Sequence, residues 1–451
     1  MLSKSNDINR NQMEIIALDD MVPEDHLVRK IEQAIDFSFI YELVEDLYCS
    51  DNGRPSIDPV VLIKIVFIQY LFGIKSMRKT IDEINTNVAY RWFLGYGFTD
   101  KVPHFSTFGK NYVRRFADTD LFEQIFYRIL REAMNKGFVD PSVAFIDSTH
   151  VKANANKKKY EKKVARSETR IYQDLLEEEI NVDRVKEGKK PLTSRTKQET
   201  KEIKVSKTDP DSGYYVKDER EKMFAYSFHT ASDSKGFILG SIVTPGNVHD
   251  SKILNPLVEK IKKDIQKPSA VAVDAGYKTP YIAKYLMDQD ILPVMPYTRP
   301  RTKPGFFRKH EYVYDEYYDC YICPEGQILR YSTTNREGYR VYSSNPSICQ
   351  SCELLKQCTE NKQNKKQVFR HIWEPYMEEV EHLRHTKLNK KLYHMRKETI
   401  ERAFGDAKEK HGMRWTTLRG LKKVSMQAML TFAAMNLKKL ANWSWKNSCT
   451  T

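Results

Sequence analysis

Hydrophobic and polar residues follow two different patterns along the chain, and the pattern changes near residue 143. From about Asp25 to Leu130, apolar residues recur at helical spacing. The segment Val60–Phe72 is apolar on nearly every side, which indicates a buried helix that begins at Asp58-Pro59. Residues 1–135 are therefore predicted to form an all-helical domain.

Beyond residue 143 the apolar residues come in short runs that are typical of buried strands. These runs are Val143–Asp147, Phe224–His229, Phe237–Val243, Ala270–Asp274 and Ile291–Tyr297. The turn Asp233–Gly236 predicts a hairpin between the second and third runs. A helix is expected at Thr279–Gln289. Strands that are first antiparallel and then alternate with helices predict a mixed α/β sheet in a second domain, residues 140–445.

Two stretches interrupt this second domain. Residues 154–207 are highly charged and are predicted to be helical. Residues 299–373 are rich in tyrosine and cysteine and contain short β-like pieces. A basic helix is expected at Lys387–Trp415 and an apolar one at Val424–Leu440. The second domain is therefore expected to be discontinuous, with a charged helical insertion and a Cys-rich insertion.

Composition narrows the class of protein. Of the 451 residues 40% are hydrophobic, which is enough for a sizeable core, and the net charge is +14. A positive excess suits a polyanionic partner such as nucleic acid. The longest apolar run is broken by Lys64 and Gln69, so no membrane span is expected. The polar N-terminus has no signal-peptide pattern, and we expect a soluble, cytoplasmic protein.

Three acids stand out as candidate catalytic residues. Asp147 and Asp274 each end a predicted strand, where the functional crevice of an α/β sheet lies, although one such acid alone is more often a cap or an ion-pair partner. Glu401 lies on the late basic helix, on the same face as Lys408 and about 10 Å from it along the axis. Spacing leaves Glu398 and Glu409 open as alternatives to Glu401.

Histidines offer a competing site. His249 stands beside Asp250 at a predicted strand end, and His150 follows Asp147 by three residues. Either histidine could act as a base or a metal ligand, although such a residue is more often a local hydrogen-bonding group.

In combination these motifs resemble those of bacterial insertion-sequence DDE transposases. The motifs that carry the resemblance are Asp147-Ser-Thr-His150, Asp209-Pro-Asp-Ser-Gly213, Pro245-Gly-Asn-Val-His-Asp250, Asp274-Ala-Gly-Tyr277, Tyr393-x2-Arg396, Glu401-x6-Lys408 and Arg419-Gly-Leu421, with Gly53-Arg-Pro-Ser56 and Trp92-Phe-Leu-Gly95 in the helical domain. In the family pattern three residues separate the arginine from the glutamate. Here four residues separate Arg396 from Glu401, and Lys397 holds the expected place.

The resemblance implies a ribonuclease H-like core in which Asp147, Asp274 and Glu401 hold two Mg²⁺ or Mn²⁺ ions. Such a pair of ions can activate a nucleophile and stabilise the leaving oxygen of a phosphoryl transfer, and carboxylate oxygens suit these hard cations. The resemblance also implies that Lys408 grips a DNA phosphate, with Tyr393 and Arg396 near the DNA. It implies as well that the helical domain of residues 1–135 binds DNA.

Cysteines and lysines add two further candidate sites. Cys320-x2-Cys323 and Cys349-x2-Cys352 have the spacing of a structural zinc site, with Cys358 as a substitute ligand and free thiols as the alternative. Lys157, Lys158 and Lys159 form a cationic run that could bind DNA phosphates, although a single run is more often a solvated face.

The leading interpretation is a DNA transposase that hydrolyses and joins phosphodiester bonds at the ends of an insertion sequence. Its expected partners are double-stranded DNA and further copies of itself on that DNA, with location at the nucleoid when bound. Two alternatives stay open. The first is a metal-dependent nuclease of the same fold, and the second is a zinc-containing DNA-binding protein whose acidic site is idle.

Overall fold

A computed structural model describes residues 13–49, 56–166, 172–193, 200–217 and 221–448. The chain forms two compact units. The first comprises the residues up to Asp140, Val151–Asn154 and the residues from Ala403 onward, and the second comprises Pro141–His150 and Ala155–Arg402. Of the motifs named above, Gly53, Arg54 and Pro55 lie outside the described residues.

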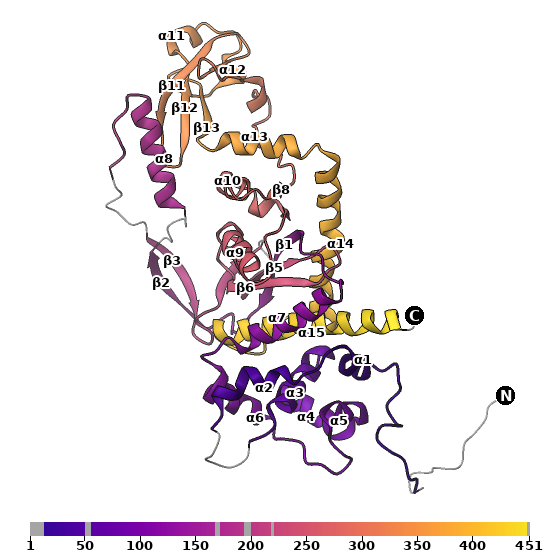
Figure 1. The fold of residues 1–451 in the computed structure, drawn as a ribbon. Coiled ribbons are helices and arrows are strands. Elements are labelled where there is room, and N and C mark those ends of the chain that lie inside the picture. Colours follow the sequence, from indigo (N-terminus) through magenta and orange to yellow (C-terminus); the bar gives the residue numbers. More distant parts are fainter. Residues whose placement is uncertain (1–12, 50–55, 167–171, 194–199, 218–220, 449–451) are drawn as a thin grey trace, which may run out of the picture. The chain divides into compact units, whose positions relative to one another are not determined.

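The first unit is helical, as predicted. Its helices are α1 (Leu27–Ala34), α2 (Phe39–Val44), α3 (Pro59–Leu71), α4 (Met77–Thr86), α5 (Val88–Leu94), α6 (Ser106–Asn111), α7 (Leu121–Asn135) and α15 (Leu421–Ser448), with the short turns η1 (Glu45–Leu47) and η2 (Tyr112–Phe116). The predicted start of α3 is confirmed, because the Asp58 side chain accepts hydrogen bonds from the backbone N–H groups of Val60 and Val61. Helix α15 packs against α1, α3 and α7 (Figure 1).

The C-terminal helix therefore packs with the helical unit, whereas the sequence pattern placed it in the second domain. The middle of α15 is buried on several sides, from Val424 to Ala441. A helix that is apolar on several sides needs neighbours around it, and α1, α3 and α7 supply them. None of the described helices combines the length and the hydropathy that crossing a bilayer requires.

A six-stranded mixed sheet forms the centre of the second unit. Its strands are β1 (Val143–Lys152), β4 (Gly213–Val216), β5 (Lys222–Ser232), β6 (Ile238–Pro245), β7 (Ala270–Ala272) and β8 (Leu292–Val294). They run in the order β4-β5-β1-β7-β8, and β6 pairs with β5 as the predicted antiparallel hairpin. Strands β1, β7 and β8 are parallel.

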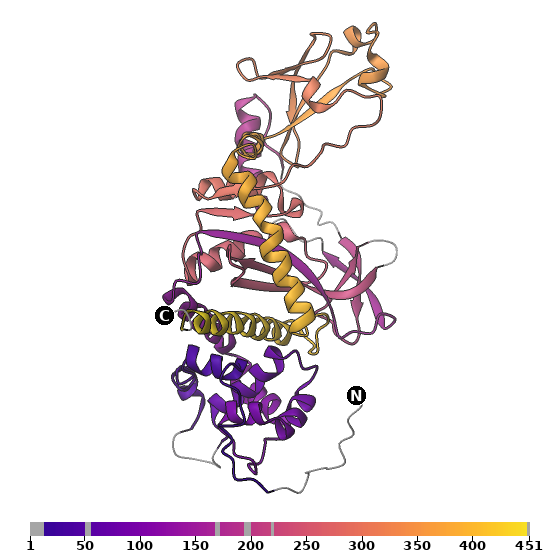
Figure 2. The same ribbon diagram turned by 90° about the vertical axis from the view of Figure 1, so that its right-hand side faces the viewer.

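Helices cover both faces of this sheet. They are α9 (Leu254–Asp264), α10 (Pro280–Asp288), α13 (Glu374–Leu383) and α14 (Lys387–Lys410). Helix α9 packs against β5 and β6, and α10 packs against β8. Figures 1 and 2 show the sheet lying between these two helices and α14. The predicted mixed α/β architecture is therefore confirmed.

One prediction is wrong: residues 154–207 are not helical throughout. Among the described residues of this stretch only α8 (Gln173–Lys186) is a helix, and β2 (Tyr160–Arg166) pairs with β3 (Thr200–Ser206) as an antiparallel ribbon. Lys162 forms an ion pair with Glu202 across the ribbon, with 3.1 Å between Nζ and Oε2. Backbone pairing and this cross-strand pair prevail over the helix-favouring composition.

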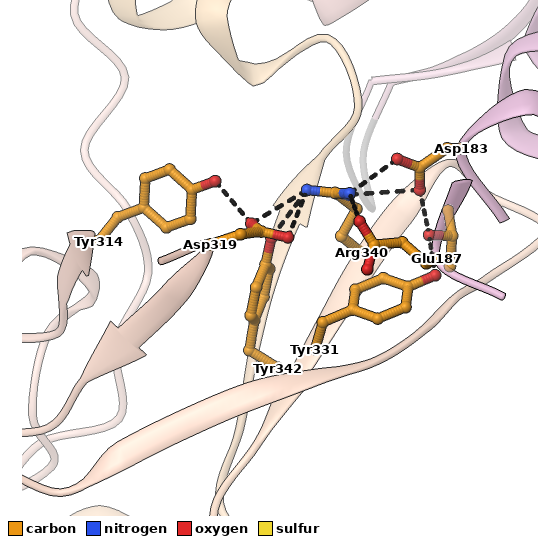
Figure 3. A network of polar contacts seen from close by, with 8 residues as sticks. Asp183, Glu187, Tyr314, Asp319, Tyr331, Arg340 and Tyr342 are labelled. Atoms are coloured by element: carbon orange, nitrogen blue, oxygen red, sulfur yellow. Dashed lines mark hydrogen bonds and ion pairs between the residues drawn. The ribbon is translucent and has the colours of Figure 1, made fainter. Parts of the chain in front are cut away.

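The Tyr- and Cys-rich segment forms a separate five-stranded antiparallel sheet. Its strands are β9 (Val313–Asp315), β10 (Cys320–Ile322), β11 (Ile328–Thr334), β12 (Tyr339–Ser343) and β13 (Gln367–His371), and the short helices α11 (Pro346–Cys349) and α12 (Leu355–Cys358) lie between the last two strands in the chain. The guanidinium of Arg340 on β12 forms ion pairs with Asp183 and Glu187 of the α8 region and with Asp319 (Figure 3). This network joins α8 to the sheet.

Candidate active site

The strand register brings the first two acids together. Strand β1 pairs with β7 so that Val143 lies opposite Ala270 and Phe145 opposite Ala272. Continuing the same register by two residues places Asp147 opposite Asp274. The sequence prediction that Asp147 ends its strand is wrong, because β1 continues to Lys152. It is β7 that stops before this level, so Asp147 lies beside the end of its neighbour.

Asp274 lies in a tight turn directly after β7. Its side chain caps the turn η4 (Ala275–Tyr277) by accepting a hydrogen bond of 3.0 Å from the Gly276 N–H. A Cβ atom at position 276 would lie 3.2 Å from Oδ1 of Asp274 and 3.5 Å from Oδ2 of Asp250. Glycine at this position therefore leaves room for two carboxylates, and the turn holds Asp274 at the edge of the sheet.

Arg396 links Asp147 to the third acid. Its Nη2 lies 2.7 Å from Oδ2 of Asp147, and its Nη1 lies 3.3 Å from Oε1 of Glu401. The arginine side chain is 7% exposed, that of Asp147 15% and that of Glu401 50%. The guanidinium thus lies between a largely buried carboxylate and a half-exposed one, both in the second unit.

Burial makes the charge of Asp147 costly. Desolvation raises its pKa to about 6, against the lowering effects of Arg396 and of the Ser148 N–H. Asp274 and Glu401 add smaller repulsions that also raise this pKa. One guanidinium therefore compensates the acid cluster incompletely, and a further cation would find favourable charge here.

A fourth acid, Asp250, borders this cluster. Its Oδ1 lies 3.6 Å from Nδ1 of His229, and burial raises its pKa, whereas a hydrogen bond with the Ser148 side chain lowers it. His229 is fully buried, and desolvation lowers its pKa to about 3, so the ring is neutral at pH 7. Its ring nitrogens contact Tyr277 Oη at 3.3 Å and Thr244 Oγ1 at 3.0 Å.

Sequence reasoning singled out His249 and His150 near Asp250 and missed His229. The ring of His249 instead caps a short turn and contacts Ser251 Oγ at 2.8 Å. His150 Nε2 lies 3.2 Å from the Gly246 carbonyl oxygen, and its ring stacks on Tyr215. Because His229 lies inside an apolar strand, its sequence neighbours gave no sign of a role.

Two of the family-like motifs meet next to Asp250. A Cβ atom on Gly213 would lie 2.5 Å from the backbone nitrogen of Asn247, so no larger residue fits there. The segment that ends in Gly213 therefore packs directly on the segment that carries Asp250. This contact gives a structural role to two motifs that the sequence had left without one.

The remaining predicted residues of α14 lie in different surroundings. Tyr393 is partly buried. Glu398 is 71% exposed, and its Oε1 lies 3.9 Å from Nδ1 of His394, so this acid faces solvent, unlike Glu401, which contacts Arg396. Lys408 follows Glu401 on the same helix but belongs to the first unit, as does Glu409, which pairs with Arg414. The roles of Tyr393 and Lys408 stay predictions.

The lysine run and the cysteines lie apart from the acids in the chain. Lys157, Lys158 and Lys159 are exposed just before β2. Cys320 is buried on β10, and the largest influence on its thiol is desolvation, which raises its pKa. By contrast, Cys323 and Cys358 both pack against the aromatic cluster around Tyr312. Burial and, less strongly, Cys323 and Cys349 raise the pKa of Cys358, so the substitute ligand of the predicted zinc site lies near these two cysteines.

In the part of the chain that the structure describes, no group of three or more His, Cys, Asp or Glu side chains is arranged so that it could hold a metal ion. The Arg396 guanidinium contacts two of the candidate acids, Asp147 and Glu401. The carboxylate oxygens themselves are the donors that Mg²⁺ and Mn²⁺ prefer.

Models of known protein families match two parts of the chain, one near each end. A family model described as "Transposase domain (DUF772)" matches residues 16–114, and one described as "Transposase DDE domain" matches residues 322–441. The first match spans α1 to α6, and the second includes Arg396, Glu401 and Lys408. The comparisons with curated proteins and with solved structures gave no match. Together the two matches support an insertion-sequence DDE transposase, the family that the sequence motifs resemble.

Proposed function

We propose that this transposase cleaves and joins DNA at the ends of its element, and that Asp147, Asp274 and Glu401 are its catalytic acids. The observation that carries the proposal is the approach of these acids at one edge of the sheet. Asp147 and Asp274 share a strand register, and Glu401 reaches Asp147 through Arg396. These residues come from three distant segments of the chain, and acids that merely faced solvent would have no reason to approach one another.

In this proposal the three acids would hold Mg²⁺ or Mn²⁺. The donor set fits, because it consists of carboxylate oxygens and because buried Asp147 has only one guanidinium to offset it. When bound, the ions would activate the attacking hydroxyl and stabilise the leaving oxygen of a phosphoryl transfer. Asp147 would act as an ionised ligand and not as a proton shuttle. Gly276, which has no side chain, would leave room for the Asp274 carboxylate beside the turn.

The mixed sheet supports a ribonuclease H-like core for this chemistry. The parallel strands β7 and β8 end at one edge of the sheet, where acids of such a site are expected, and Asp147 on β1 lies beside the end of β7. Residues 154–207 and 299–373 would be insertions in that core, the second one Cys-rich.

Basic residues beside the same edge support a DNA substrate. Strand β8 is parallel to β7, so the chain that follows β8 leaves the sheet where Asp274 lies. This chain carries Arg299, Arg301 and Lys303, which are exposed and line an open hollow. Guanidinium and ammonium groups bind the DNA backbone without regard to sequence. Lys157–Lys159, Tyr393, Arg396 and Lys408 would extend these contacts, and several copies would act together on paired ends.

A plasmid assay with the full chain tests this proposal. With Mg²⁺ and a donor that carries the flanking ends, a transposase yields joined products. Cleavage without joining would identify a metal-dependent nuclease of the same fold. DNA binding without metal-dependent cleavage would identify a DNA-binding protein with an idle site. Either of the last two results would overturn the proposal.

A further inference from the structure

Arg396 is a buried, positively charged side chain that contacts two of the candidate acids. It lies on α14 and is 7% exposed, and its two terminal nitrogens contact carboxylates from different segments, Asp147 on β1 and Glu401 on its own helix. Arg396 and Glu401 are five residues apart, or about 140° around the helix, so the two side chains do not share a face. The arginine therefore reaches toward the acids instead of along the helix surface.

The hydrogen bonding of this guanidinium is incomplete. Its Nε is buried and has no hydrogen-bond partner among the described residues. A buried donor without a partner is costly, and in native proteins such groups often mark functional positions. The contacts to Asp147 and Glu401 thus hold Arg396 in a place where one of its donors stays unsatisfied.

The same two carboxylates are needed by a metal ion. A divalent cation and a guanidinium repel each other strongly at distances of a few ångströms, above all in a partly buried site. Both cannot therefore contact Asp147 and Glu401 closely at the same time. In this structure the guanidinium of Arg396 contacts both carboxylates.

We propose that Arg396 is the resident cation of the acid site in the metal-free protein, and that it competes with divalent metal for Asp147 and Glu401. Arg396 is in this account a positioning residue that keeps the buried acid neutralised until metal enters. Metal binding requires its guanidinium to leave the space between the carboxylates. The inference rests on the proposed function, because it takes these acids as the metal ligands.

The test is the affinity of the full-length, DNA-free protein for Mn²⁺, measured by electron paramagnetic resonance of the free ion. Arg396→Gln removes the competing charge and should tighten Mn²⁺ binding about tenfold. Arg396→Lys keeps one charge but cannot bridge two carboxylates, and should tighten binding about threefold. Arg370→Gln is the matched control, because Arg370 is also largely buried (10% exposed) and pairs with Glu378, which is not one of the candidate acids. The Mn²⁺ affinity of this variant should equal that of the unchanged protein.

The opposite results would overturn either the inference or the proposed function. Unchanged or weaker Mn²⁺ binding by both Arg396 variants would overturn the inference, and the lysine variant decides alone if the glutamine variant fails to fold. Glu401→Gln distinguishes this failure from that of the proposed function. If Glu401→Gln weakens Mn²⁺ binding while the Arg396 variants do not tighten it, only the competition is wrong. If Glu401→Gln leaves Mn²⁺ binding unchanged, the acids do not bind metal and the proposed function fails too.

Discussion

Two arginines in the second unit bridge carboxylates, and they do so in opposite ways. Arg340 uses Nε, Nη1 and Nη2 on Asp183, Asp319 and Glu187 and also contacts Tyr342 Oη (Figure 3). All three of its nitrogens have partners. Arg396 contacts two carboxylates with its terminal nitrogens, and its Nε has no partner among the described residues.

The difference separates a structural ion-pair network from a candidate functional one. Around Arg340, three acids from two segments are held by a fully used guanidinium, which joins α8 to the five-stranded sheet. Around Arg396, only the two terminal nitrogens have partners among the described residues, and burial raises the pKa of Asp147. A guanidinium with an unused donor beside a carboxyl group whose pKa is raised is typical of a functional site.

The largest effect is expected where the arginine is fully used. Arg340→Met leaves Asp183, Asp319 and Glu187 without their cation, which should cost about 3 kcal/mol of local stability. Amide hydrogen exchange in α8 should therefore accelerate about a hundredfold. Arg330→Met, on the exposed side of the neighbouring strand β11, is the control and should leave α8 unchanged. Equal protection of α8 in both variants would show that the network does not hold this helix.

A smaller effect is expected at Asp147, and it depends on pH. The pKa of this carboxyl rises from 3.8 to about 6 on folding, mainly through burial. The folded state then binds its proton more tightly than the unfolded state, so this group's stabilising contribution is complete below about pH 4 and is lost as the pH rises through 6. Asp147→Asn should thus stabilise the metal-free protein by about 2 kcal/mol at pH 8 and little at pH 4.

Thermal unfolding in the presence of a chelator measures this difference. Asp319→Asn in the Arg340 network is the control and should destabilise the protein at both pH values, because Asp319 receives hydrogen bonds from Arg340 and Tyr342. If Asp147→Asn lowers the melting temperature at pH 8, the negative charge of Asp147 stabilises the fold as the acids around Arg340 do. The proposed difference between the two arginine sites would then be wrong.

The smallest effect is expected at the exposed lysines. Replacing Lys157, Lys158 and Lys159 by alanine should weaken duplex DNA binding and reduce the slope of log affinity against log salt by at most about 2.7, or about 0.9 for each phosphate that is no longer neutralised. Fluorescence anisotropy with labelled DNA measures both quantities. Alanine at Lys186, Lys189 and Lys190 removes the same charge near the end of α8 and should change the slope less. If both alanine variants show the same slope, Lys157, Lys158 and Lys159 have no special role in DNA binding and are only solvent-exposed lysines.

Much of this fold follows from local sequence patterns. The apolar run after Asp58-Pro59 forms α3, and the turn Asp233–Gly236 joins β5 and β6, because burial and turn geometry act over a few residues. The charged ribbon of β2 and β3 was not predicted, since strand pairing between segments about 40 residues apart leaves no periodic apolar signal. The Arg340 network was not predicted either, because Asp183 lies 157 residues before its partner.

The site was predicted only in part, because local patterns indicate single residues and do not indicate contacts between distant segments. Acids at the ends of apolar runs pointed to Asp147 and Asp274, and family resemblance pointed to Glu401. The sequence could not indicate that β1 continues past Asp147, nor that Arg396 contacts two of the acids, because both depend on which strands and helices lie side by side. His229 and Asp250 meet across the fold in the same way.

The most direct test of the central claim compares Glu401 with Glu398, three residues earlier on α14. Glu401→Gln keeps the size of the side chain but removes a charge from the acid site, so Mg²⁺-dependent cleavage and joining should be lost while DNA binding and folding remain. Glu398 is 71% exposed and faces His394, so Glu398→Gln should keep most activity. Both variants are assayed for cleavage and for DNA binding on the same preparations. An active Glu401→Gln beside an inactive Glu398→Gln would contradict the assignment of the third acid, and full activity in both would contradict the three-acid site.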